Sequence, residues 1–328
     1  MLPQEKVQRK RLIKTKTLTM SKFGEIPNQR SLKDLVNSGV VLLDKPSGPT
    51  SHQVSAWVRD ILGIEKAGHG GTLDPRVTGL LPITLGTATN AVRTLLIGGK
   101  EYVGIMQFHS DVHKKKIEEI FREFTKKIYQ IPPVRSAVKR ELRIREIYYL
   151  ELLEMEKRLA LFKVGCEAGT YIRTLCHDIG DALGIGAHML ELRRTKIAKF
   201  TEEEAVTLHD LKDAFVYWKE NREETHLRKA VLPMERLLDH LPKTVVKVSA
   251  VDAICHGANL ALPGVLQVDS DIKKGDMVAL ISNKGEGIAL GEAILPSKDI
   301  LEGDEGVAVN TKRVLMVPGT YPRLWRTK

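Results

Sequence analysis

The spacing of apolar residues changes repeatedly along this chain, from the pattern of a strand to the pattern of a helix. Residues 40–43 form a short continuous apolar run typical of a buried strand, and residues 160–166 alternate with the period of two that a strand requires. In residues 54–62 and 172–183 the apolar positions recur at helical spacing, and a glycine follows each stretch where the helix should end. No internal repeat is visible. We therefore expect mixed α and β structure with a non-repeating order of elements.

Less regular patterns extend this prediction. We expect a strand at residues 101–108 and a charged helix at about residues 117–127, and we assign Trp57 to the buried stripe of the first helix. Beyond Pro242, short strand-like pieces are separated by Gly, Asp and Lys turns, which is typical of a small β-rich domain. These pieces are residues 245–248, 265–268, 277–282 and 288–293.

The chain is basic, with 51 Lys and Arg against 41 Asp and Glu in 328 residues. The net charge of +10 attracts polyanions, although a solubilising shell would explain it equally well. Residues 1–30 carry eight Lys or Arg and two Glu, and this arm either touches RNA or packs against the C-terminal part of the chain. Residues 113–145 hold eleven Lys or Arg against four Asp or Glu around Pro132 and Pro133, which favours a projecting basic loop over a solvated helix face.

Several other classes of protein fit poorly. The apolar runs are far shorter than the roughly 20 residues of a membrane span, and no apolar core of a secretion signal follows the basic N-terminus. Cys166, Cys176 and Cys255 show no Cys-x-x-Cys spacing, and no histidine pair has the helical spacing of a metal motif. We therefore expect a reduced, cytoplasmic protein with no disulfide and no metal site.

Residues 68–75 contain a candidate catalytic carboxylate, Asp74. Pro75 follows it and holds its backbone extended. Gly70 and Gly71 precede it and permit a close approach to a ligand. Taken alone, this spacing favours a structural role, because Asp often caps the turn or helix that begins at the next residue.

Tyr102, Tyr171 and Arg173 are further candidates. Tyr171 and Arg173 lie two residues apart at a predicted strand-to-helix junction, where both side chains can point into a cleft. An Arg beside a carboxylate lowers the pKa of that carboxylate and orients it. The alternatives are a surface Arg, a Tyr with its hydroxyl in water and, for Tyr102, a core aromatic on a strand. Spacing alone does not separate these alternatives.

Four segments, taken in their order along the chain, resemble the motifs of the TruB-type pseudouridine synthases. Residues 44–51 resemble the Lys-Pro-x-Gly-x-Thr-Ser motif, and residues 68–75, with residues 78–82 after them, resemble the catalytic motif. Residues 169–175 resemble the third motif, and residues 186–195 resemble the segment that follows it. Four motifs in the family's order are far more specific than any one of them.

Within that family the chain is most similar to dyskerin and its archaeal homologues, the catalytic subunits of H/ACA ribonucleoproteins. The similarity is carried by residues 131–140 and 174–180, by the basic arm, and by a C-terminal region that resembles a PUA domain, with residues 275–276 and 317–322 as landmarks. The chain has no long Lys-rich tail, which favours the archaeal type.

The resemblance implies an α+β fold, in which a catalytic domain with a mixed, mostly antiparallel sheet precedes a small β-rich PUA domain. The implied divisions are a basic N-terminal arm at residues 1–30, the catalytic domain at 31–242, the PUA domain at 243–320 and a C-terminal tail at 321–328.

The resemblance also implies a role for each candidate residue. Asp74 corresponds to the catalytic carboxylate, as nucleophile or base, and Arg173 to the arginine that pairs with it. Tyr171 corresponds to a pocket residue that is a candidate for proton removal from C5 of the base. The residues that correspond to RNA contacts are Tyr102, stacked on the target base, Leu192 beneath it, His69 at the vacated stack position, and Lys139 and Arg140 on a loop that holds phosphates.

A structural role is the alternative for His69, which would then hydrogen-bond backbone in its loop. We also expect Lys45 and Pro46 to shape the turn beside Asp74 and not to take part in the chemistry.

Pseudouridine formation breaks the N1–C1′ bond, turns the uracil and rejoins it through C5, without net oxidation or reduction. The resemblance therefore implies no cofactor. A carboxylate can attack covalently or remove a proton from the ribose, and the sequence leaves this choice open. Two other functions also stay open: an RNA-binding scaffold without activity, and an aspartate-based N-glycosidase that stops after bond cleavage.

RNA is the expected partner, and no membrane partner is expected. The TruB-type resemblance implies the T-loop uridine of tRNA as a substrate. The dyskerin resemblance implies rRNA, reached with an H/ACA guide RNA and three partner proteins: a Gar protein, a zinc-ribbon Nop protein and a kink-turn binder.

Overall fold

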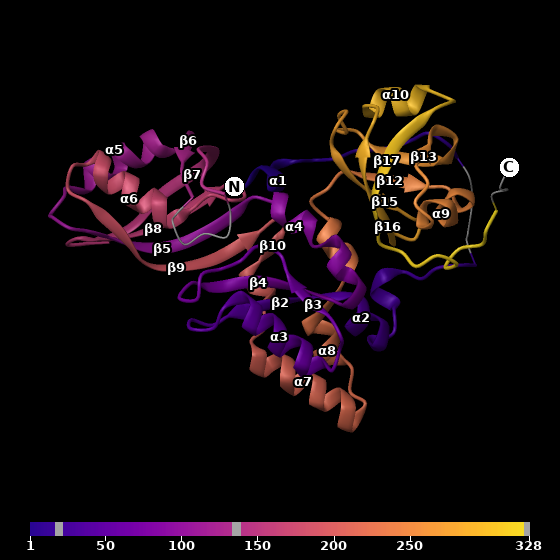
Figure 1. The fold of residues 1–328 in the computed structure, drawn as a ribbon, viewed down its shortest axis with the longest axis horizontal. Coiled ribbons are helices and arrows are strands. Elements are labelled where there is room, and N and C mark those ends of the chain that lie inside the picture. Colours follow the sequence, from indigo (N-terminus) through magenta and orange to yellow (C-terminus); the bar gives the residue numbers. More distant parts are fainter. Residues whose placement is uncertain (17–21, 133–138, 325–328) are drawn as a thin grey trace.

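The computed structural model describes residues 1–16, 22–132 and 139–324. In this part of the chain the strands form two sheets, one of ten strands and one of seven (Figure 1). The tip of the predicted basic loop, residues 133–138, lies outside the described residues.

The ten-stranded sheet runs in the order β11-β2-β4-β9-β5-β8-β7-β6, with β10 beside β9 and β3 beside β4. Its pairs are antiparallel except β4 with β9. The predicted mixed, mostly antiparallel sheet is therefore confirmed. The bounds are β2 Gly39–Lys45, β3 Ala67–His69, β4 Thr78–Leu85, β5 Lys100–Phe108, β6 Lys127–Gln130, β7 Arg143–Glu156, β8 Leu159–Cys166, β9 Ala187–Ile197, β10 Phe200–Thr201 and β11 Val231–Pro233.

Helices cover this sheet, and the two that lie beside the candidate site begin and end where the sequence predicts. Thr50 caps α3 and exchanges hydrogen bonds with Gln53, and Gly63 ends the helix in the left-handed conformation. Tyr171 is the N-cap residue of α6. The helices of this part are α2 Leu32–Ser38, α3 Ser51–Leu62, α4 Arg93–Ile97, α5 Lys114–Phe124, α6 Ile172–Ala182, α7 Leu208–Asn221 and α8 Thr225–Ala230, with short 3-10 helices at Pro27–Gln29, Gly86–Ala91, Glu202–Glu204 and Met234–Leu238.

Three details of the sequence prediction are wrong. Trp57 is 44% exposed, because it lies on the flank of the apolar stripe that Val54 and Val58 bury. The charged helix is α5, which ends at Phe124, and Lys127 already belongs to β6. The strand expected at 245–248 ends at Val246, and a helix starts at Val248.

The seven-stranded sheet runs in the order β1-β14-β12-β15-β16-β17-β13 and encloses its own apolar cluster. Its strand β1 comes from the N-terminal arm. The bounds are β1 Arg11–Ile13, β12 Lys243–Val246, β13 Leu260–Ala261, β14 Val265–Asp269, β15 Met277–Ile281, β16 Gly287–Ala293 and β17 Val307–Val314, with α9 Val248–Cys255, α10 Ser297–Glu302 and a short 3-10 helix at Leu262–Gly264.

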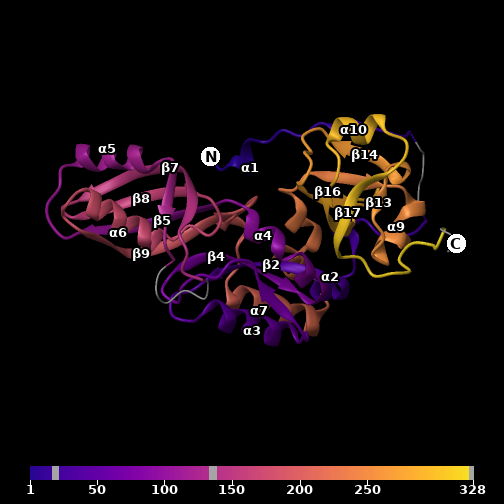
Figure 2. The ribbon, with the colours of Figure 1, turned by 45° about the horizontal axis from the view of Figure 1, so that its top comes forward.

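The N-terminal arm crosses from one sheet to the other (Figures 1 and 2). In α1, Pro3–Lys6, the Gln4 amide donates to the backbone oxygens of Gly99 and Ala198, in the part that contains the ten-stranded sheet. Arg11 pairs with Asp269 of β14 at 3.0 Å. A third apolar cluster contains residues from both sheets, so the two parts of the chain share a packed joint.

No helix among the described residues is long and apolar enough to cross a membrane.

Candidate active site

Asp74 lies in the loop between β3 and β4, and the residue before it is tied to the start of α3. The Ser51 hydroxyl accepts from the Leu73 backbone N–H at 2.9 Å and donates to the Leu73 carbonyl at 3.0 Å. Both residues are buried. One side chain therefore satisfies both backbone polar groups of the position next to Asp74.

Lys45 fixes the other side of the loop. Its fully buried ammonium group donates to the carbonyl oxygens of Pro46, Pro75 and Val77, at 2.9, 2.9 and 3.0 Å. Burial lowers the pKa of Lys45. Two of the three acceptors lie one and three residues after Asp74, so the expected structural role of Lys45 is confirmed.

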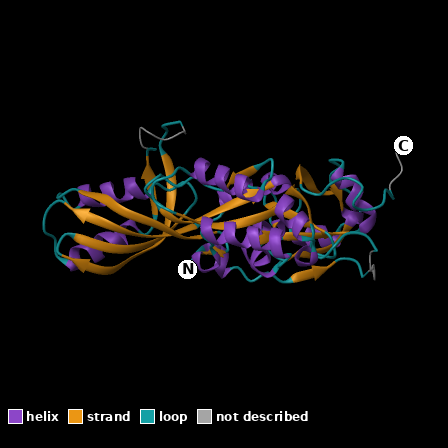
Figure 3. Cartoon of the chain, turned by 90° about the horizontal axis from the view of Figure 1, so that it is seen from below, coloured by secondary structure: helices purple, strands orange, loops and turns teal. Residues whose placement is uncertain are grey.

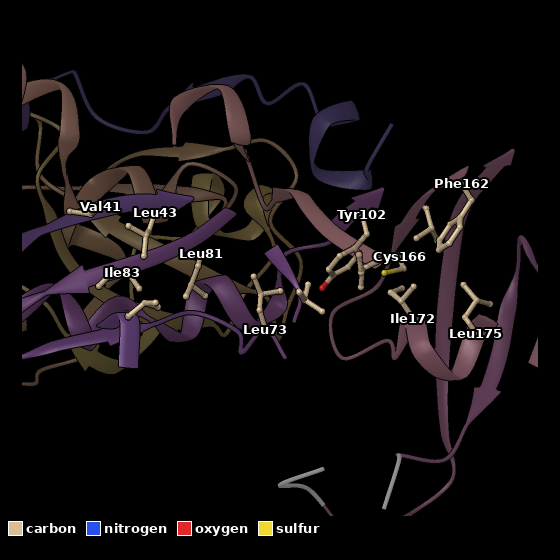
Figure 4. Packing of buried hydrophobic residues seen from close by; sticks show 14 of the residues in the cluster. Val41, Leu43, Leu73, Leu81, Ile83, Tyr102, Phe162, Cys166, Ile172 and Leu175 are labelled. Atoms are coloured by element: carbon tan, nitrogen blue, oxygen red, sulfur yellow. The ribbon is translucent and has the colours of Figure 1, made fainter. Parts of the chain in front are cut away.

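Arg173 reaches Asp74 from the first turn of α6, and its Nη2 forms an ion pair with the Asp74 Oδ2. Both side chains are 51% exposed, so the pair faces solvent. Their neighbours Leu73 and Ile172 are buried in one apolar cluster and anchor the two segments. Figure 4 shows Leu73 and Ile172 on either side of Tyr102.

Tyr102 lies on β5 and is only 7% exposed, so the expectation of a core aromatic is met. Its hydroxyl points toward Leu73 (Figure 4) and forms a hydrogen bond with Arg194. Burial raises the pKa of Tyr102, and the nearby guanidinium partly opposes that shift. Leu192, two residues before Arg194 on β9, is in the same apolar cluster.

Arg194 is fully buried and holds the loop from behind. It donates to the carbonyl of Leu80 at 2.7 Å and to the carbonyl of Gly71 at 3.2 Å. Burial lowers the pKa of Arg194. Gly71 has a positive φ of 87°, a conformation that favours glycine. The guanidinium therefore joins the glycine turn before Asp74 to the hydroxyl of Tyr102.

Tyr171 is half-buried at the start of α6, and its backbone contacts Gln130 at the end of β6. Its N–H donates to the Gln130 Oε1 at 2.9 Å, and its carbonyl accepts from the Gln130 Nε2 at 3.1 Å. Tyr171 is thus brought to the same helix end as Arg173.

His69 ends β3 and places its ring 4.8 Å, centroid to centroid, from that of His52 in an edge-on contact. Burial lowers the pKa of His69 to about 4, and the neighbouring His52 and Arg194 add to the effect. Its Nδ1 is buried without a hydrogen-bond partner among the residues that the structure describes. The ring is therefore neutral near pH 7.

Lys139 and Arg140 lie on the connection between β6 and β7, and their side chains contact other residues of that connection. Lys139 forms an ion pair with Glu141, and Arg140 Nε donates to the carbonyl of Pro132 at 3.2 Å. Figure 3 shows the β6–β7 hairpin standing away from the layered sheets.

Within residues 1–16, 22–132 and 139–324, no three His, Cys, Asp or Glu side chains are grouped as a metal site would require.

Four regions of the chain match known domains. Residues 59–172 match the TruB family pseudouridylate synthase N-terminal domain, and residues 173–239 match the tRNA pseudouridylate synthase B C-terminal domain. Residues 242–315 match the PUA domain, and residues 2–55 match the DKCLD (NUC011) domain.

Relatives are similar over the whole chain. The "Probable tRNA pseudouridine synthase B" of Methanopyrus kandleri is 54% identical over 320 residues, which cover 98% of this chain and 95% of that protein. The protein of the same name from Methanocaldococcus jannaschii is 50% identical and covers 100% of both chains. The chain belongs to the TruB family of pseudouridine synthases.

Two solved structures show the same fold in ribonucleoprotein complexes. A chain in "Structure of H/ACA RNP bound to a substrate RNA containing 2'-deoxyuridine" is 47% identical, with a TM-score of 0.93 over 99% of this chain and 100% of that one. A chain in "Crystal Structure of a Cbf5-Nop10-Gar1 Complex" is 50% identical, with a TM-score of 0.94 over 98% of each. The DKCLD match and these structures confirm the similarity to dyskerin and its archaeal homologues.

This pseudouridine synthase is an isomerase, since its family interconverts two nucleosides of equal composition. Membership speaks against a scaffold without activity and against an N-glycosidase, the two alternatives that the sequence left open.

The sequence did not single out three residues that position the site of this pseudouridine synthase: Ser51, Gln130 and Arg194. Arg194 lies inside a motif segment, so the motif was a signal, but arginines are rarely buried and the default expectation was a surface residue. Gln130 had no signal except its place directly before the proline-rich loop.

Proposed function

We propose that this pseudouridine synthase converts uridine to pseudouridine in RNA with Asp74 as the catalytic carboxylate and Arg173 as its partner. The observation that carries the proposal is their ion pair, formed between two segments that are far apart in the sequence. In the reaction, the N1–C1′ bond breaks and a C5–C1′ bond forms. The C5 proton leaves to water and N1 takes up a proton, so no cofactor is required.

The neighbouring residues fit supporting roles. Tyr102, fixed by Arg194, offers a rigid aromatic wall for the flipped base, where stacking contributes about 1–3 kcal/mol. Leu192 is the apolar surface beneath the base. Tyr171, two residues before Arg173 at the start of α6, is the group that takes the C5 proton when its phenol is ionised. His69, neutral near pH 7, can fill the vacated stack position without adding charge.

The RNA itself is held by positive charge. Lys139 and Arg140 are exposed on the β6–β7 connection, and the chain as a whole carries +10. Phosphate contacts of this kind position an RNA without reading its sequence. We propose that this hairpin grips the backbone of the substrate on the face where Asp74 is open to solvent.

We further propose that the protein is the catalytic subunit of a guide-RNA-directed H/ACA complex acting on rRNA, and that it also modifies the T-loop uridine of tRNA. The solved relatives named above support the first mode, because they are titled as H/ACA and Nop10-Gar1 complexes. The relatives named tRNA pseudouridine synthase B support the second. The proposed partners are the H/ACA guide RNA and proteins of the Gar, zinc-ribbon Nop and kink-turn-binding types. A cytoplasmic location fits these RNA partners and the three free, buried cysteines.

The test is tritium release from RNA labelled at C5 of uridine. We expect wild type to release tritium and form pseudouridine, and Asp74→Asn to lower the rate by at least about 10⁴-fold while RNA affinity changes by less than about threefold. Asp111→Asn is the matched control, since Asp111 also pairs with an arginine, Arg158, but lies outside the site.

Each RNA is assayed with and without the partner proteins, so that the two modes are separated. A tRNA transcript tests the stand-alone mode, and an rRNA fragment with its guide RNA tests the guided one. Turnover by Asp74→Asn at the wild-type rate contradicts the catalytic assignment, and free uracil as the product contradicts the isomerisation.

A further inference from the structure

Gln130 is the last residue of β6 and is only 2% exposed. It pairs with Arg143 in the final step of the β6–β7 ladder, so it stands at the point where the hairpin leaves the sheet. Its side chain turns inward and binds both polar backbone groups of Tyr171, the N–H at 2.9 Å and the carbonyl at 3.1 Å. An amide carries one accepting atom and one donating atom, so its side chain can bind both polar groups of one backbone position.

Tyr171 is the N-cap residue of α6, and its conformation (φ −97°, ψ 104°) sets the direction in which the helix starts. The side chain of Tyr171 makes no capping hydrogen bond to the first turn of α6. Gln130 therefore fixes the backbone two residues before Arg173 from outside the helix. The Gln130 side chain is buried and Tyr171 is half-buried, so water competes weakly for these two hydrogen bonds and their loss is costly.

A second contact joins the same two segments. The Glu167 backbone N–H donates to the carbonyl of Glu146 on β7 at 2.8 Å, and the Glu146 N–H donates to the Glu167 Oε2 at 3.1 Å. Arg145, also on β7, lies against Gly169, where an added Cβ would be 3.2 Å from the guanidinium. The hairpin base thus holds the segment 167–171 from both of its strands.

We propose that Gln130 is a positioning residue that couples the RNA-holding β6–β7 hairpin to the arginine that pairs with Asp74. The proposal rests on the proposed function, in which the hairpin grips RNA and Asp74 with Arg173 carries the chemistry. Displacement of the hairpin by bound RNA reaches Arg173 through the two amide hydrogen bonds to Tyr171. RNA binding and the orientation of Arg173 are then linked, and Gln130 affects the rate of the chemical step more than the affinity for RNA.

The experiment compares Gln130→Glu, Gln130→Met and wild type in single-turnover tritium release with saturating RNA, using the substrate that wild type accepts. A carboxylate at position 130 accepts from the Tyr171 N–H but repels its carbonyl, whereas a protonated carboxyl restores both hydrogen bonds. Burial at this 2% exposed position raises the pKa of the introduced carboxyl above its usual value of about 4.3. We therefore expect the rate constant of Gln130→Glu to be at least about tenfold below wild type at pH 8 and within about threefold at pH 5.5. Gln130→Met, with similar volume and no hydrogen bond, is expected to stay low at both pH values.

RNA affinity is measured for each variant, and we expect it within about threefold of wild type, which also shows that the protein is folded. Gln107→Met is the matched control: Gln107 lies five residues beyond Tyr102 on β5, roughly 17 Å along the strand, and its rate should equal that of wild type. A rate of Gln130→Met equal to wild type overturns the proposal. So does a ratio of Gln130→Glu to wild type that does not change with pH. Activity of Asp74→Asn would contradict the proposed function, and this result is distinguishable from the rates of the Gln130 variants, which test only the role of Gln130.

Discussion

Single buried polar side chains hold the loop that carries Asp74, and Ser51 is the one that binds it most directly. Replacing Ser51 with Ala leaves the N–H and the carbonyl of Leu73 without partners in a buried place. We expect Ser51→Ala to lower the free energy of unfolding by about 1–3 kcal/mol and the single-turnover rate by about tenfold. Urea unfolding and tritium release measure the two effects.

Ser55→Ala is the control for this substitution, because it removes a buried hydroxyl from the same helix. Ser55 donates to the carbonyl of Ser51, one turn earlier, and among the described residues its hydroxyl has no hydrogen bond to the loop. We expect its rate to stay within about twofold of wild type. Equal losses of rate in the two variants would show that helix α3, and not the tie to Leu73, matters for turnover.

Some contacts of the site could be predicted from the sequence and others could not, and the difference shows at single residues. The motifs predicted that Asp74 and Arg173 would meet, and they do. They did not predict that Arg194 would be buried against backbone carbonyls, because the acceptors, Gly71 and Leu80, come from segments more than a hundred residues away. The motifs also did not predict the contact between Gln130 and Tyr171, which lie 41 residues apart. A contact between remote segments has no local pattern, so only a motif or a structure reveals it.

Elements are predicted where their residues carry their own start and stop signals. Helix α3 follows its capping residue Thr50 and its terminal Gly63, and β5 and β8 follow their alternating patterns. The arm strand β1 has only three residues and no pattern of its own, since its structure depends on pairing with β14. Strand β1 therefore forms because its backbone can hydrogen-bond to the free edge of β14.

The pairing of β1 with β14 predicts which backbone N–H groups of the arm take part in hydrogen bonds between the two strands. Lys14 donates its N–H to Leu266, and the Lys10 carbonyl accepts from Ser270, so the even-numbered residues of β1 face β14 with their backbone groups. Leu12→Pro therefore removes a ladder hydrogen bond, while Ile13→Pro removes an N–H that points away. We expect trypsin to cleave after Lys14 about tenfold faster in Leu12→Pro than in wild type, and Ile13→Pro to resemble wild type. Equal protection of the arm in both variants would contradict this register.

At the scale of the whole molecule, the two sheets act together because they share a packed joint. Val40 and Leu42 of β2 lie in one apolar cluster with Val245 of β12 and Leu266 of β14. His240 lies in the segment between the sheets, is 7% exposed, and shares a hydrogen bond of 2.9 Å with the carbonyl of Thr94. The joint therefore contains a titratable group that is almost out of contact with water.

Burial lowers the pKa of His240 from 6.5 to about 4; the bond to Thr94 opposes that shift, and Arg9 and Lys199 add to it. Well above pH 6.5 the imidazole is neutral in both the folded and the unfolded chain, so it does not make stability depend on pH. As the pH falls below 6.5 the unfolded chain binds a proton first, and stability is lost until about pH 4. The loss attributable to His240 at pH 5 is about 2 kcal/mol.

His240→Gln tests this at the joint, since glutamine can still donate to Thr94 but does not titrate. Unfolding free energies of wild type and variant are compared at pH 7.5 and pH 5. We expect the acid-induced loss to be about 2 kcal/mol smaller in His240→Gln than in wild type. His226→Gln, at a 66% exposed side chain on α8, should lose as much as wild type. If His240→Gln also does, the joint does not exclude water from the imidazole, and the two sheets are less firmly packed than their shared apolar cluster implies.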